Sequence, residues 1–221
     1  KDNLFNFKNV NEQYIFNQFE GQIDTGNMME SLLEKAQSKG VKILNNIQVQ
    51  NFSEDTDSVK IKSNQFEFSA SKLLIATNGF ASQLINQKVK PARAQVLITK
   101  PIENLDIKGT FHLDRGYYYF RNIDNRILIG GGRNLDYKGE ETTEFNQTAI
   151  IQNKLEALLK TIILPETPFE IDHRWSGIMG VGNQKKAIVK QLSNHVFCGV
   201  RLGGMGVAIG SLVGKELADL V

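Results

Sequence analysis

Apolar positions along the chain follow two spacings, and these predict its secondary structure. In Asn27–Ser38 they recur every three to four residues, as in an amphipathic helix that Gly40 ends. The same spacing predicts a helix over Asn146–Ile162, while Leu73–Ala76 is apolar throughout and predicts a buried parallel strand. Shorter apolar or alternating runs predict strands at Val41–Val49, Ser58–Lys62, Gln65–Ser69, Pro91–Thr99, Gly109–Leu113, Tyr117–Asn122, Arg126–Gly130, Phe169–Ile178, Ala187–Lys190 and His195–Gly199.

The order of these elements predicts a mixed α/β and α+β fold. A β-α-β fragment comes first, a mostly antiparallel sheet with one long helix follows, and a strand, a loop and a helix close the chain. We therefore expect one domain built from residues 1–89 and 195–221, with a second domain at 90–194.

Composition narrows the possible functions. The chain of 221 residues has 26 basic and 24 acidic residues, a balance that predicts no nucleic acid partner. One cysteine and three scattered histidines predict neither a disulfide nor a metal site. We expect a cytoplasmic protein without membrane association, because no apolar run is long enough to span a bilayer and no signal pattern occurs. The opening at Lys1, without Met, leads us to expect a fragment or a processed chain.

Glycines crowd the segment before the last predicted helix. Gly203, Gly204 and Gly206 precede that helix, whose first N–H groups and dipole attract an electron-rich group. Gly206, Gly210 and Gly214 then share one helix face. This bare face fits either close packing of the helix on a sheet or contact with a flat ring. A dinucleotide fingerprint fits less well, because the spacing has one residue too many and no second parallel strand with an acidic residue follows.

Several short motifs together resemble a known family. They are Gly21–Asp24, Ala76–Gly79, Pro91–Gln95 and Gly199–Gly206. In this order they are similar to those of the D-amino-acid oxidase, glycine oxidase and sarcosine oxidase group of flavoenzymes. The resemblance implies a glutathione-reductase-like FAD-binding domain with an antiparallel substrate domain. It also implies oxidation of a C–N bond of a small amine or amino acid by hydride transfer to FAD.

The resemblance also implies which residues contact a non-covalent FAD. Val49 would meet the adenine, the turn after Ala76 would lie near the dinucleotide, and the terminal loop would face the pyrimidine edge of the flavin. The implied cofactor residues are Val49, Thr77, Asn78, Gly79, Gly203, Gly204, Met205, Gly206 and Val207. Cys198 is expected to be a buried thiol and not a covalent flavin link. The family's N-terminal strand and G-x-G-x-x-G turn are missing from this sequence, so we expect that a fragment alone neither retains FAD nor is active.

Candidate substrate residues come from the middle of the chain. Tyr119 and Arg121 share one face of a predicted strand, and arginine offers a planar two-point grip on a carboxylate. In glycine-oxidase relatives an arginine in Trp-x-Gly-x-Arg-Pro holds the substrate carboxylate, and here Met179 takes its place, which argues against a simple amino acid. The predicted catalytic residues are Tyr119, Arg121, Arg174, Met179 and Arg201. The alternative is that the tyrosines pack a core and the arginines form structural ion pairs.

Two other functions fit the same sequence. A relative that oxidises a modified tRNA base would need a basic docking surface, against which the near-neutral composition argues. A non-catalytic ligand-binding or assembly module would use the sheet and the glycine-rich helix only for packing.

Overall fold

The computed structural model describes residues 3–11 and 13–221, which form two compact units. The sheet unit consists of Lys1–Asp24, Arg93–Glu140 and Glu144–Gly177. The loop unit consists of Thr25–Ala92, Glu141–Thr143 and Ile178–Val221. The chain passes from one unit to the other at residues 92/93 and again at 177/178. The domain boundaries predicted from the sequence were 89/90 and 194/195. Residues 178–194 belong with the end of the chain.

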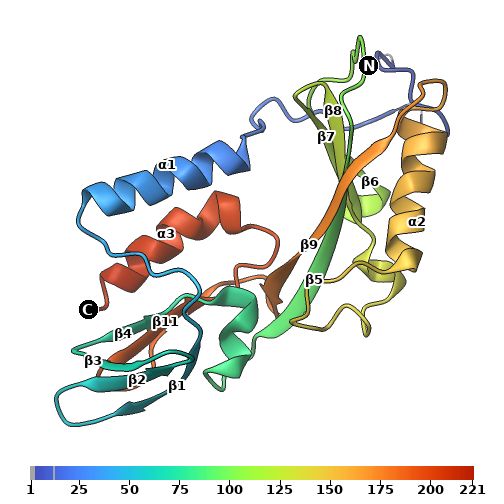
Figure 1. Cartoon of the computed structure of the whole chain (residues 1–221). Coiled ribbons are helices and arrows are strands. Elements are labelled where there is room, and N and C mark those ends of the chain that lie inside the picture. The colour runs from blue at the N-terminus through green and yellow to red at the C-terminus, as the bar shows by residue number, and fades with distance from the viewer. Residues whose placement is uncertain (1–2, 12) are drawn as a thin grey trace. The chain divides into compact units, whose positions relative to one another are not determined.

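A sheet in the order β6-β7-β8-β5-β9 organises the sheet unit (Figure 1). Its strands are β5 (Lys90–Thr99), β6 (Thr110–Leu113), β7 (Tyr118–Ile123), β8 (Arg126–Gly131) and β9 (Ile171–Val181). The pairings β6·β7, β7·β8 and β8·β5 are antiparallel, as predicted, and place Tyr119 opposite His112 on one side and Gly130 on the other.

Helix α2 (Ala149–Leu158) supplies the other half of this unit's core. Phe120 and Ile129 of the sheet and Leu155 of the helix are almost completely buried, and each such side chain contributes about 1.5–3 kcal/mol of transfer free energy. Phe111 stacks on Phe120 at a centroid distance of 4.6 Å. The helix ends in a π-helical turn, Leu159–Ile163, so the predicted helix over 146–162 is confirmed with a later start.

Two small sheets and two helices make up the loop unit. Its elements are α1 (Thr25–Ser38), β1 (Val49–Glu54), β2 (Val59–Ser63), β3 (Glu67–Ala70), β4 (Leu73–Ile75), β10 (Ile188–Gln191), β11 (Val196–Val200) and α3 (Gly206–Ala218). The sheets have the orders β1-β2-β3 and β10-β11-β4. β4 pairs in parallel with β11, which confirms the parallel strand predicted at 73–76, but only Ile75 is buried and Leu74 is exposed, so the predicted burial on both faces is wrong for these residues.

The strand predicted at Val41–Val49 is wrong. The first strand begins only at Val49. Asn46 has a φ of 61°, a left-handed conformation that interrupts an extended run, and the Gln48 N–H donates to the Asn64 side chain instead of a neighbouring strand. Apolar alternation alone does not make a strand where no partner strand is available.

Candidate functional site

The side chain of Asn78 links two segments of the loop unit that are far apart in sequence. Asn78 follows β4, and its Oδ1 accepts the Leu202 N–H at 3.0 Å. The Gly203 N–H in turn donates to the Gly180 carbonyl at 2.9 Å. Asn78 has a φ of 45°, a left-handed conformation that asparagine tolerates better than most residues. The turn after β4, the end of β9 and the terminal loop therefore meet at one point.

Two glycines make this meeting possible. A Cβ on Gly79 would lie 2.7 Å from the Ile178 carbonyl oxygen, and one on Gly180 would lie 2.5 Å from Asn78 Oδ1. Both distances are shorter than any van der Waals contact allows. The sequence analysis selected Gly79 but not Gly180, whose only sequence signal is a glycine at the end of a long strand.

The terminal loop keeps backbone donors free at the start of α3. The Met205 and Ala208 N–H groups bond within the loop and first turn, whereas Gly204, Gly206 and Val207 have no recorded acceptor among the residues that the structure describes. Gly204, Met205 and Val207 are exposed. The loop thus presents unpaired donors and the positive end of a helix dipole at the surface of this unit.

The glycine face of α3 does not serve packing within this unit. α3 contacts β11 through Val213 and Leu217, which lie against Gly199. A Cβ on Gly210 or Gly214 would meet nothing within 4 Å, and one on Gly203 would also be in open space. Within the described residues, Gly210 and Gly214 therefore pack on neither sheet of this unit, whereas a Cβ on Gly206 would lie 3.6 Å from the Leu202 side chain.

Met179 lies beside the same loop. Its Sδ is 4.0 Å from the position of a Cβ on Gly204. Five residues predicted to act on cofactor or substrate, namely Asn78, Gly79, Met179, Gly203 and Gly204, are therefore brought together in the loop unit. Val49 is not part of this group, since it pairs with Ser63 at the edge of the unit's core.

Tyr119 and Arg121 lie on β7 in the sheet unit, facing away from the core that Tyr118 and Phe120 enter. Tyr119 is 37% exposed, and its hydroxyl lies across Gly130, where a Cβ would come within 2.5 Å. Burial raises the pKa of the Tyr119 hydroxyl above its ordinary value. The Arg121 guanidinium donates to the Ile23 carbonyl.

Arg174 belongs to a polar network. Its guanidinium donates to Gln152 at 2.7 Å and to Glu156 at 2.6 Å. Gln152 donates to Gln95, and Gln95 donates to Glu140.

At the other end of this network lies a buried ion pair. Arg93 donates two hydrogen bonds to the carboxylate of Glu140, at 2.7 and 2.9 Å, and both residues are almost completely buried. The hydrogen bonds that Arg93 donates to the Glu140 carboxylate raise the pKa of Arg93. The motif Pro91–Gln95 thus places Arg93 and Gln95 around an acid that sequence reasoning missed, because it lies in a loop with no motif of its own.

Arg201 and Cys198 lie near the terminal loop in sequence. Arg201 donates to the carbonyl oxygens of Lys186, at 2.8 Å, and Lys88, at 3.3 Å. Cys198 is fully buried in β11, as predicted, and burial raises its pKa.

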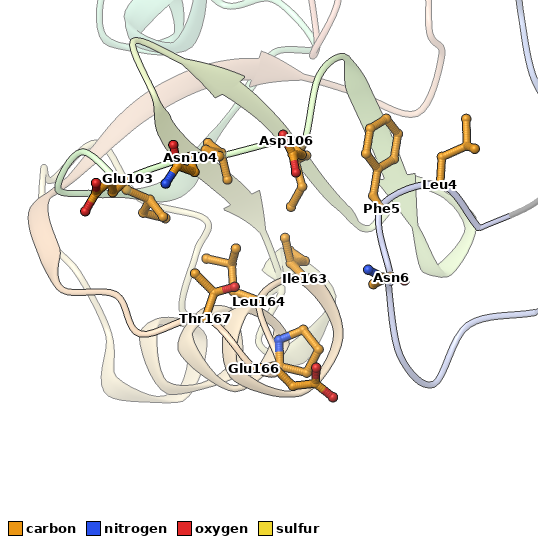
Figure 2. A pocket seen from close by; sticks show the side chains of 14 residues that line it. Leu4, Phe5, Asn6, Glu103, Asn104, Asp106, Ile163, Leu164, Glu166 and Thr167 are labelled. Atoms are coloured by element: carbon orange, nitrogen blue, oxygen red, sulfur yellow. The ribbon is translucent and has the colours of Figure 1, made fainter.

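A separate surface hollow of about 210 Å³ occurs in the sheet unit (Figure 2). Phe5, Ile163 and Leu164 form part of its wall, and Glu103 and Glu166 lie at its rim. It contains none of the residues predicted for a site. Within residues 3–11 and 13–221, no group of three or more potential ligands is placed to hold a metal, and no helix is both long and apolar enough to cross a bilayer.

Comparison with known proteins identifies the family. Residues 8–220 match the family model of the FAD-dependent oxidoreductases, which covers nearly the whole chain. The chain belongs to this family. FAD is the cofactor on which the family depends, and the mixed α/β fold agrees with that of its members.

Individual members of the FAD-dependent oxidoreductase family are distant in sequence. The probable oxidoreductase OrdL of Haemophilus influenzae is 21% identical over 94% of this chain and 49% of its own length. Glycine oxidase from Geobacillus kaustophilus is 18% identical with a TM-score of 0.75, over 88% of this chain and 53% of that chain. L-proline dehydrogenase from P. horikoshii is 19% identical with a TM-score of 0.73, over 89% and 55%. The chain thus spans about half the length of these relatives.

The residues of the loop unit fit one part of FAD. Unpaired N–H groups at Gly204, Gly206 and Val207 suit an electron-rich ring edge, and the absent side chains leave room for a flat group. No strand followed by a G-x-G-x-x-G turn for the pyrophosphate occurs among the described residues.

Proposed function

We propose that these residues form part of a FAD-dependent oxidoreductase that oxidises a C–N bond of a small amine or amino acid. The observation that carries the proposal is the terminal loop, where open space at Gly203 and Gly204 lies beside the unpaired N–H groups of Gly204, Gly206 and Val207. Relatives named glycine oxidase, iminodiacetate oxidase and fructosamine oxidase share the fold and support the substrate class.

The loop would hold the flavin by its pyrimidine edge. When bound, FAD supplies the two-electron acceptor that takes a hydride from the carbon next to nitrogen. The N–H groups of Gly204, Gly206 and Val207 and the α3 dipole are fixed before the reaction, so they stabilise negative charge without reorganisation. The turn at Thr77–Gly79 keeps this loop in place through Asn78.

In the sheet unit, we assign the substrate-orienting role to residues of strand β7. Tyr119 combines a partly exposed ring with a hydroxyl whose pKa burial raises, and Arg121 lies two residues further along the same strand face. Both suit orientation of a small polar substrate. Met179 would present an apolar thioether near the loop, which favours an amine whose neighbouring group is not a carboxylate.

We infer further that the flavin domain is completed by polypeptide outside these residues. β4 lies at the edge of its sheet although it is a parallel strand, and parallel strands are normally paired on both sides and buried. Leu74 on this strand is 40% exposed, and α1 buries none of its residues. A further apolar strand with a helix would cover these surfaces, in accord with the half-length match to relatives.

The test uses the protein as its own gene encodes it, purified and supplied with FAD. We expect the visible absorption of oxidised flavin, and its loss under anaerobic conditions when a primary or secondary amine is added. The first panel combines glycine, L-proline and iminodiacetate with primary and secondary amines that carry no carboxylate. A protein that takes up no FAD, or a flavin that no amine in a broad panel reduces, would refute the proposal.

A further inference from the structure

The Arg201 guanidinium in the loop unit is held in place without a carboxylate partner, by the backbone of two exposed lysines. Arg201 has a φ of 66°, a left-handed conformation that is strained for a residue with a side chain. Its guanidinium is fixed by the carbonyl oxygens of Lys186 and Lys88. These two bonds use two of the five N–H donors of the guanidinium, so three are left for another acceptor.

A glycine at position 182 leaves the space that the Arg201 side chain occupies. A Cβ on Gly182 would lie 2.7 Å from Arg201 Cδ and 2.9 Å from the Lys88 carbonyl oxygen. Only glycine at 182 lets the arginine lie there. The Arg201 side chain is therefore fixed on both sides, by hydrogen bonds and by close contact.

Neighbouring charges are all positive in sequence. Residues 68–102 and 173–215 contain no Asp or Glu. Lys88, Lys185 and Lys186 are exposed, and in the part of the chain that the structure describes no salt bridge joins them or Arg201 to an acid. The nearest lysine in sequence that has such a partner is Lys90, which pairs with Glu141.

We propose that Lys88, Lys186 and Arg201 form a binding site for a diphosphate group. A forked guanidinium matches phosphate oxygens, and lysines add point charges. Three cations can match the several negative charges of a diphosphate. The diphosphate belongs either to FAD or to a separate phosphorylated ligand, and the experiment separates these sources.

The test titrates inorganic pyrophosphate into the full 221-residue chain at low salt and measures heat. We expect one saturable site whose affinity falls as NaCl rises. Arg201→Gly should weaken binding at least about fivefold, the size of one charge-assisted contact, and should keep the fold because glycine accepts a positive φ. Lys186→Ala should weaken it to a similar extent. Lys215→Ala is the matched control, since Lys215 already pairs with Asp219.

Two further arms make the result decisive. The competition is measured on the protein as its own gene encodes it, under conditions where FAD binding is seen by flavin absorption. If FAD then competes with pyrophosphate, its own diphosphate occupies the site; if pyrophosphate still binds to the FAD-loaded protein, the ligand is a separate molecule. The proposal is overturned if pyrophosphate does not saturate, if Lys215→Ala weakens binding as much as Arg201→Gly, or if single-stranded RNA binds where pyrophosphate does not. Because the titration needs no flavin reduction, its failure would leave the proposed function standing.

Discussion

At the residue scale, the tightest constraint in the loop unit is the crossing of Gly180 over Asn78. Gly180→Ala would push a methyl group to 2.5 Å from Asn78 Oδ1. We expect a loss of about 1–3 kcal/mol in the free energy of unfolding, from overpacking that also displaces the Leu202 hydrogen bond. Urea denaturation measures it. Gly177→Ala on the same strand is the control, because its Cβ would meet nothing within 4 Å. Equal stability of the two variants would contradict this account.

For the buried ion pair of Arg93 and Glu140, we expect removal of one charge to cost more stability than removal of both. Glu140→Leu leaves the guanidinium buried without its acid, and we expect a cost of about 3–5 kcal/mol. The double variant Arg93→Met with Glu140→Leu removes both charges and should recover most of that loss. Thermal and urea unfolding of both variants test this. A Glu140→Leu variant as stable as the parent chain would show that the pair has no such role.

Asp172 predicts a pH dependence. The hydrogen bond from Arg126 lowers the pKa of Asp172 below its ordinary value. A lowered pKa in the folded state contributes stability that is present above the ordinary carboxyl value of about 3.9 and is lost as the pH falls through the folded value. Asp172→Asn should therefore melt at a lower temperature than the parent at pH 7, and the difference should vanish once the pH is below both values. A difference that persists unchanged in acid would contradict the assignment.

At the scale of elements, the open glycine face of α3 predicts that larger residues there do not destabilise the chain. Gly210→Ala and Gly214→Ala fill open space on a helix, where alanine is favoured over glycine by roughly 0.5–1 kcal/mol. We expect each variant to raise the melting temperature of the 221-residue chain. A marked loss of stability would mean that this face is packed by the chain itself.

The secondary-structure elements also differ in how well they could be predicted from the sequence. The antiparallel strands, α2, α3 and the parallel β4 were predictable, because their spacing is set by their own residues. The strand at 41–49 was not, because a strand depends on a partner elsewhere in the chain. Among the candidate site residues, the glycines of the terminal loop could be selected from their number, whereas Gly180 and Glu140 act through contacts with residues at least 45 positions away.

At the scale of the whole molecule, the two units carry residues with different proposed roles. The loop unit carries the N–H groups that we propose face the flavin, and the sheet unit carries Tyr119 and Arg121, which we propose orient the substrate. The exposed edge of β4 and the uncovered residues of α1 belong to the loop unit, which is the one that a further part of the polypeptide would complete.

The most direct test of this account is a titration of FAD into the protein as its own gene encodes it, followed by the visible absorption of the flavin. Gly204→Asp places a carboxylate in open space at the loop, where a Cβ meets only Met179 Sδ at 4.0 Å. We expect it to weaken FAD binding by about tenfold or more, because its charge opposes the electron-rich edge of the ring. Gly21→Asp, equally free of contacts, should bind FAD as the parent does. If Gly204→Asp binds FAD as tightly as the parent protein, the loop does not hold the flavin.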